Sequence, residues 1–227
     1  MSPAATRPAA RGGRAGRVFS AVAFMVIGAV GALLVVSAGG GGRSGPADAR
    51  PAGKVEIGFA QDMIVHHQQA VTMAQTVLGR RGVGPSVSQI ATGVQLNQLR
   101  EIGQMQGWLT LWDAPQVTSG PPMTWMNGEH GTAHATKDGV MPGLASVQET
   151  NRLGELEGEE LEVWFLQLMI RHHQGGLAMA TAAARQTGDR HVRSLAVLMS
   201  AEQRQETATM TGLLTALGHK PLPSPAT

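Results

Sequence analysis

The sequence predicts an all-α protein in which two repeated helical hairpins form a four-helix bundle. Two segments 106 residues apart carry nearly the same phrase, and nine of their sixteen positions are identical, including every Met and His. The segments are FAQDMIVHHQQAVTMA at residues 59–74 and FLQLMIRHHQGGLAMA at residues 165–180. No segment shows the alternation of apolar and polar residues that a half-buried strand requires. Because one hairpin buries too little surface to be stable alone, the two copies are expected to pack together around a pseudo-two-fold axis.

The chain begins with a basic tail and an apolar run that are expected to lie outside the bundle. Residues 1–17 carry four arginines, and residues 18–38 are 21 consecutive residues without a charge. This pattern is typical of an export signal or a membrane anchor, and the length of the run favours a retained transmembrane segment. Because the positive flank stays in the cytoplasm, the rest of the chain is expected outside it, held by a single membrane span or secreted after cleavage. Residues 39–54, rich in Gly, Pro, Ser and Ala, are expected to be a flexible linker.

The distribution of charge argues against a nucleic-acid partner. Seven of the 18 Lys and Arg, but only one of the 16 Asp and Glu, lie in residues 1–54. Residues 55–227 therefore hold 11 basic and 15 acidic residues, a net charge of −4 with neutral His. These basic residues are scattered, so binding to nucleic acid is not expected. The chain has no Cys, so any metal site must do without thiolate ligands, and stability must come from a packed core.

The first repeat, residues 55–113, is expected to contain two helices. Apolar residues recur at helical spacing from residue 55 to about residue 79, and the Gly and Pro residues that follow end this helix. Ser86 followed by Gln89 has the spacing of a capping box and predicts the start of a second helix, which runs to about residue 112.

A connection over residues 114–145 separates the first repeat from the second, which covers residues 159–217. The connection is rich in Pro and Gly and has no helical period, which is typical of a functional or mobile loop. Ser146 with Glu149 predicts a capping box that begins a short acidic helical stretch. The repeated phrase then lies on a helix from about residue 159 to 186, and a last helix runs from about 189 to 217 before a tail that ends at residue 227.

The repeated phrase places Met and His on one face of each helix. On a helix that advances about 100° per residue, Met63, His66, His67 and Met73 fall within a stripe about 120° wide. His66 and His67 diverge by about 100°, so they are expected to point into different environments. The second copy repeats this layout with Met169, His172, His173 and Met179. The duplication extends into the partner helices, where Gln98, Glu101 and Met105 align with Gln203, Glu206 and Met210.

These residue types in this pattern favour a metal site. A single Met on an apolar helix face is more often core filler than a ligand, but here paired His residues flanked by Met recur in both copies. Thioether sulfur is soft and imidazole is borderline, which suits copper and above all Cu(I). Calcium and magnesium prefer oxygen ligands, structural zinc sites draw on Cys as well as His, and the chain has no Glu-x-x-His di-iron motif. The candidate metal ligands are Met63, His66, His67, Met73, Met105, Met169, His172, His173, Met179 and Met210.

The connection carries further soft and borderline ligands. It contains Met123, Met126, His130, His134 and Met141. Their spacings would allow the loop to bind a soft ion as it folds over the bundle. The alternative is a disordered linker that happens to contain them, because loops of this kind vary freely.

The doubled motifs resemble those of the domain of unknown function 305 family, which are bacterial exported proteins. The motifs are Met-Ile-x-His-His, a Met-Ala six residues after the second His, and Gln-x-x-Glu-x-x-x-Met on the partner helix. The resemblance covers residues 55–217 and implies a ferritin-like helical bundle. Some members of this family are associated with periplasmic copper binding and copper resistance, so the resemblance also implies copper binding. The chain departs from the copper-associated members in a less Met-rich connection, and its two copies differ where Gly175-Gly176 replace Gln69-Ala70.

The leading hypothesis from the sequence is a membrane-tethered, extracytoplasmic protein that sequesters or passes on copper, as Cu(I) or Cu(II), through His and Met ligands. It is expected to have no organic cofactor and no enzymatic activity. A second hypothesis is a structural or interaction module of the cell envelope, whose His pairs hydrogen-bond across the pseudo-two-fold axis and bind no metal. A metal-dependent oxidase ranks last, because the sequence indicates neither an open coordination site nor a substrate pocket. A metal ion and the membrane are the expected partners, and a homo-oligomer or an envelope protein remains open. His191 and His219 have no comparable neighbours and are expected at the surface.

Overall fold

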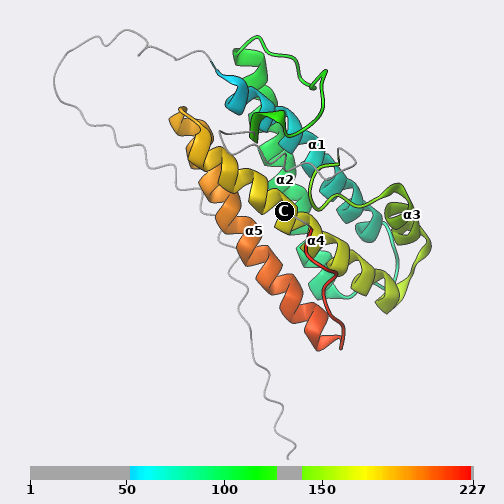
Figure 1. Ribbon diagram of the computed structural model, residues 1–227. Coiled ribbons are helices and arrows are strands. Elements are labelled where there is room, and N and C mark those ends of the chain that lie inside the picture. Colours follow the sequence, from blue (N-terminus) through cyan, green and yellow to red (C-terminus); the bar gives the residue numbers. More distant parts are fainter. Residues whose placement is uncertain (1–51, 127–139, 226–227) are drawn as a thin grey trace, which may run out of the picture. The chain divides into compact units, whose positions relative to one another are not determined.

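The computed structural model of the chain describes residues 52–126 and 140–225, and this part is all-helical (Figure 1). It contains five α-helices and one 3-10 turn, with no strand among the described residues. The elements are α1 (Lys54–Leu78), α2 (Pro85–Leu111), η1 (Thr124–Met126), α3 (Val147–Glu155), α4 (Gly158–Gln186) and α5 (Arg190–Ala216). Each of the four long helices begins and ends within two residues of the bounds that the sequence predicts.

The long helices pack as two hairpins, α1 with α2 and α4 with α5, and the hairpins meet along α1 and α4 (Figure 1). Each helix carries an apolar stripe that one partner covers only in part, so the second hairpin buries the remainder. Phe59 of α1 and its counterpart Phe165 of α4 are both fully buried, as are Leu109 of α2 and Leu214 of α5. The two copies therefore share one packed unit, as the duplication predicts.

Helix starts follow the local sequence, with one correction to the prediction. Ser146 Oγ accepts a hydrogen bond from Glu149 N at 3.2 Å, and the Glu149 carboxylate accepts one from Ser146 N at 2.8 Å, which confirms the capping box that begins α3. The capping box predicted at Ser86 is wrong, because α2 begins one residue earlier. Gly84 is its N-cap and Pro85 its first helical residue, a position where the missing N–H of proline costs nothing.

The connection between the hairpins is held on α1 by buried hydrogen bonds. Asp62 of α1 is only 3% exposed, and it accepts hydrogen bonds from Met123 N at 2.7 Å and from Trp125 Nε1 at 2.8 Å. A buried carboxylate without such donors is strongly unfavourable. These bonds therefore fix the part of the connection around η1 against the helix, and this part is not the disordered linker that the sequence left as an alternative.

Gly58 of α1 provides the space in which the Trp125 indole packs. A Cβ atom at residue 58 would lie 2.6 to 2.8 Å from three atoms of Trp125. We expect Gly58→Ala to displace the indole and to lower the free energy of unfolding by about 1–3 kcal/mol. Urea unfolding followed by Trp fluorescence measures this change. Gly107→Ala is the matched control because its Cβ would meet no atom within 4 Å, and equal stability of the two variants would contradict the tight packing at Gly58.

The predicted anchor or signal segment, residues 18–38, lies outside the described residues, as does the linker up to residue 51. Among the helices that the structure describes, none has the length and apolar character needed to cross a membrane.

Candidate metal centre

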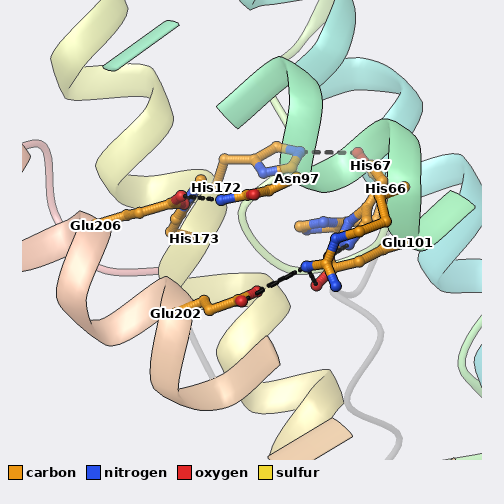
Figure 2. Close-up of polar contacts among 9 residues, drawn as sticks. His66, His67, Asn97, Glu101, His172, His173, Glu202 and Glu206 are labelled. Atoms are coloured by element: carbon orange, nitrogen blue, oxygen red, sulfur yellow. Dashed lines mark hydrogen bonds and ion pairs between the residues drawn. The ribbon is translucent and has the colours of Figure 1, made fainter. Parts of the chain in front are cut away.

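Two imidazoles from different repeats meet at the centre of the bundle, where α1 packs on α4 (Figure 2). His66 and His172, the central histidines, are 0% and 1% exposed, and their ring centroids lie 3.9 Å apart with the planes inclined by 40°. His172 Nε2 lies 3.0 Å from the carbonyl oxygen of His66, and His66 Nε2 lies 3.2 Å from the carbonyl oxygen of Pro142 in the connection. The duplicated motif thus brings its first histidines into direct contact.

The second histidine of each pair points away from the first, toward the partner helix of its own hairpin. His67 Nε2 lies 2.7 Å from Glu101 Oε2 of α2, and His173 Nε2 lies 2.6 Å from Glu206 Oε2 of α5. The ring centroids within the two pairs are 6.4 and 6.3 Å apart. These contacts of the outer histidines, His67 and His173, confirm the prediction that the members of a pair face different environments.

The hydrogen-bond partners determine which ring nitrogen carries the proton. A carbonyl oxygen only accepts hydrogen bonds, so the neutral rings of His66 and His172 donate from Nε2–H and keep their lone pairs on Nδ1. His67 and His173 donate from Nε2–H in the same way to an ionised carboxylate of Glu101 or Glu206. No described protein group hydrogen-bonds to Nδ1 of any of the four rings, and all four Nδ1 atoms are buried. Histidines that ligate metals characteristically donate their other N–H to a carbonyl or carboxylate in this way. In each of the four rings Nε2 is held by a protein oxygen, and Nδ1 has no hydrogen-bond partner among the described residues.

Burial keeps three of these histidines, His66, His67 and His172, uncharged. It lowers the pKa of His66 and that of His67 to about 3, and neighbouring imidazoles lower both pKa values further. Burial also holds the pKa of His172 well below its usual value. Neutral imidazole is the form that binds a metal ion, so these rings can act as ligands at neutral pH without first losing a proton.

Three glutamates of α2 and α5, Glu101, Glu202 and Glu206, lie near the outer histidines (Figure 2). Arg100 Nη2 lies 3.4 Å from Glu202 Oε2 and 3.6 Å from Glu101 Oε1. Burial raises the pKa of Glu101 to about 7, and burial together with the charge of Glu101 raises the pKa of Glu202 to about 7. Burial also acts to raise the pKa of Glu206, but the hydrogen bond and charge of His173 outweigh it, so this pKa is lowered. The seam between α2 and α5 therefore retains protonated carboxyl groups close to neutral pH.

We expect acid to destabilise the bundle through the buried histidines. The pKa of His66 and of His67 is about 3 in the folded protein and about 6.5 for an ordinary imidazole. The unfolded state therefore binds more protons as the pH falls below about 6.5, and the stability present above that pH is lost as the pH approaches about 3. Glu101 and Glu202, with pKa values raised from 4.5 to about 7, favour the folded state on acidification within that interval.

The steepest loss of stability is consequently expected below about pH 4.5, where the carboxyl groups are protonated in both states. Melting temperatures from circular dichroism between pH 7.5 and 3.5 measure this profile. The variant His66→Gln removes one proton-binding ring and should make the acid limb shallower. A melting temperature that rises steadily down to pH 4 would contradict the assignment of neutral, buried imidazoles.

The six candidate methionines of the two repeats lie in two apolar clusters. One cluster contains Met63, Met105 and Met179, and the other contains Met73, Met169 and Met210. Each cluster thus combines two candidate methionines of one repeat with one of the other. Met63 and Met73 are expected on one stripe of α1, but they pack in different clusters. The reason is that α1 and α4 run in opposite directions and cross at the histidines. Met63, before the His pair on α1, packs in the cluster of Met179, which follows the His pair on α4.

The connection adds thioethers to only one of these clusters. Met123, Met126 and Met141 are 2%, 7% and 6% exposed, and all three pack in the cluster that contains Met63. The two remaining candidates of the connection, His130 and His134, lie outside the described residues. The two halves of the bundle are therefore unequal in their content of soft sulfur atoms.

No group of three or more His, Asp or Glu side chains within residues 52–126 and 140–225 is arranged to hold a metal ion. His191 and His219 are exposed, as expected.

The sequence-based prediction missed Glu202, although it lies four residues before Glu206, a spacing that places both on one helix face. It also missed Pro142, which contributes a backbone carbonyl that no side-chain pattern indicates.

Fold and site together define the class of this protein: an all-helical unit of two repeated hairpins around buried histidines, with methionine-containing clusters beside them. The chain belongs to the family of domain of unknown function 305 (DUF305), whose model matches residues 56–214. A comparison with curated proteins gives no match.

Solved structures of the family have the same fold. A DUF305 protein from Streptomyces coelicolor that is thought to be secreted is 39% identical, with a TM-score of 0.67 over 74% of this chain and 97% of that one. A DUF305 fragment from Deinococcus radiodurans is 36% identical, with a TM-score of 0.60 over 73% of this chain and 99% of that one. CopM in its Cu(I)-bound form is 22% identical, with a TM-score of 0.55 over 71% of this chain and 96% of that one. At this lower identity, the likeness to CopM concerns the fold alone.

Proposed function

We propose that this protein binds copper as Cu(I), and the related soft ion Ag(I), through the buried histidines and neighbouring thioethers, and that it sequesters copper outside the cytoplasm on a ferritin-like four-helix bundle. The observation that carries the proposal is the set of four buried Nδ1 atoms without a hydrogen-bond partner among the described residues, in rings whose Nε2 atoms are already held by protein oxygens. The proposed ligands are Met63, His66, His67, Met73, Met105, Met169, His172, His173, Met179 and Met210.

A cation accounts for the polarity of this interior better than hydrophobic packing does. Buried polar groups are nearly always hydrogen-bonded, so several unpaired acceptors in one region need an explanation. The unpaired atoms include, besides the four Nδ1 atoms, the side-chain oxygens of Gln98 and Gln203, which are 3% and 4% exposed. All six atoms are hydrogen-bond acceptors and none is a donor. Lone pairs of this kind are what a bound cation requires.

The softness of the neighbouring groups favours copper or silver over other cations. All six methionines proposed as ligands are at most 1% exposed, so their sulfur atoms are shielded from water. Soft thioethers suit Cu(I), whereas calcium and magnesium prefer oxygen. Crystal structures of CopM with Cu(I), Cu(II) and silver bound show that one protein of this fold holds these ions, which supports the same role here.

Titration of the metal-free protein with Cu(I), in competition with a chromophoric Cu(I) chelator, tests this function. We expect binding that withstands the chelator and that Ag(I) displaces, and no competition from calcium or magnesium in large excess. A chain that yields all its Cu(I) to a weak chelator at neutral pH would contradict the proposal.

Export is the second part of the proposal. The charge-free run at residues 18–38, behind four arginines, supports a location outside the cytoplasm, with the bundle tethered to the membrane or released by cleavage. The relative from Streptomyces coelicolor that is thought to be secreted supports the same location. Fractionation of cells that express the chain tests this location, and recovery of the bundle only from the cytoplasm would contradict it.

A structural role without metal is the second candidate function. It is favoured by the contact between His66 and His172, which joins the two hairpins through a hydrogen bond at 3.0 Å. On this reading the histidines fix the register of the bundle, and soft metal ions leave its melting temperature unchanged.

A further inference from the structure

A tight turn of the connection supplies the carbonyl that accepts from His66. The turn covers residues 141–144 and is closed by a hydrogen bond from Leu144 N to Met141 O at 3.4 Å. Pro142 and Gly143 occupy its two central positions, and Gly143 has φ +82°, the combination that defines a type II turn. The turn aims the carbonyl of Pro142 at His66 Nε2, 3.2 Å away.

The turn lies directly on the backbone of α4. A Cβ atom at Gly143 would lie 2.6 Å from the carbonyl oxygen of Arg171 and 3.1 Å from His172 Cα. A Cβ atom at Gly175 would lie 1.9 Å from the Pro142 carbonyl oxygen, which no side chain can occupy. Glycine is therefore required on both sides of this contact, since backbone meets backbone there.

Two equivalent positions of the repeated phrase, one in each copy, both contact this turn or the residue after it. Gly175 of the second copy corresponds to Gln69 of the first. Gln69 Nε2 donates to Ala145 O at 2.8 Å, and Gln69 Oε1 accepts from Ala145 N at 2.7 Å. Gln69 of the first copy thus holds Ala145, which follows the turn, by two hydrogen bonds. Gly175 of the second copy leaves space for the Pro142 carbonyl in the middle of the turn. Both members of this duplicated position thus contact the segment that carries the Pro142 carbonyl.

We propose that Gln69 and Gly175 are positioning residues, which hold the turn so that the Pro142 carbonyl fixes His66 as the Nε2–H tautomer with its Nδ1 lone pair directed into the bundle. His172 does not depend on the turn, because its Nε2–H donates to the His66 carbonyl instead. The turn therefore makes the two central histidines unequal. The consequence for metal binding rests on the proposed function, but the effect on the tautomer does not.

The test is nitrogen-15 NMR of the histidine rings in the full, metal-free chain, in which the two ring nitrogens report the tautomer directly. We expect wild-type His66 in the Nε2–H form. In Gly175→Ala and in Gln69→Leu, we expect His66 to become a mixture of tautomers while His173 stays unchanged. Gln69→Leu introduces no clash with α4, so it keeps the test decisive if Gly175→Ala fails to fold. Gly212→Ala is the control, because its Cβ would meet no atom within 4 Å.

A second readout is the affinity for Ag(I), which should fall by about 10- to 100-fold in both variants, as expected when the partner of a ligating histidine is lost. Unchanged His66 ring resonances in both folded variants would overturn the positioning role. If the resonances change but neither the wild type nor the variants bind Ag(I), the positioning role stands and the proposed function fails.

Discussion

Replacing all four buried histidines by glutamine is expected to abolish tight Cu(I) binding. Glutamine keeps a side-chain N–H for the carbonyl and carboxylate partners but replaces the imidazole nitrogen by a hard amide oxygen, which is a poor ligand for Cu(I). Loss of a partner that merely orients a ligand costs about 10- to 100-fold in affinity, so loss of the ligands themselves should cost more. Competition with a Cu(I) chelator measures the change. The variant carries His66→Gln, His67→Gln, His172→Gln and His173→Gln.

The two exposed histidines offer a matched control for this experiment. His191 and His219 lie at the surface, and neither is one of the four buried histidines. We expect the double variant His191→Gln, His219→Gln to bind Cu(I) as the wild type does. If the control loses Cu(I) and the buried variant retains it, the metal binds at the surface and the function proposed here is wrong.

Ag(I) is expected to raise the melting temperature of the wild-type protein by about 10 °C. A ligand that binds only the folded state at a thousandfold excess over its dissociation constant adds about 4 kcal/mol. In a domain of this size each kcal/mol shifts the melting temperature by about 2–4 °C. Circular dichroism or calorimetry, in a buffer without chloride, measures the shift.

The same measurement separates the two candidate functions. The variant with four glutamines should show no shift with Ag(I), and magnesium should shift neither protein. If the histidines only join the hairpins, Ag(I) leaves the wild-type melting temperature unchanged, whereas the glutamine replacements still lower it.

The sequence predicts the helices well because their determinants are local. Apolar residues at helical spacing locate all four long helices, and Ser146 with Glu149 locates the start of α3. Ser86 misleads because Pro85 immediately before it already satisfies the requirements of a first helical residue. The divergence of His66 and His67 also follows from helix geometry alone.

The grouping of the methionines cannot be predicted from one helix. Met63 and Met73 share a face of α1, yet they contact different clusters because α4 crosses α1 between them. Which residues of α4 they meet depends on the crossing point and on the opposite direction of the two helices, which no single periodic pattern indicates.

The placement of the connection could not be predicted for a related reason. It has no period, and the residues that hold it, Asp62, Gln69 and Gly175, belong to helices whose pattern they do not disturb. The signal that was available is the difference between the copies, since Gln69 and Gly175 are duplicated positions that have diverged.

The central claim is that a soft metal ion binds at the Nδ1 atoms of the buried histidines. Anomalous scattering at the copper absorption edge, from crystals of the Cu(I)-loaded protein, tests it most directly. We expect copper peaks within coordination distance of these Nδ1 atoms, between the two methionine clusters. Copper found only at surface positions such as His191 or His219, with all four buried Nδ1 atoms free of metal, would contradict it.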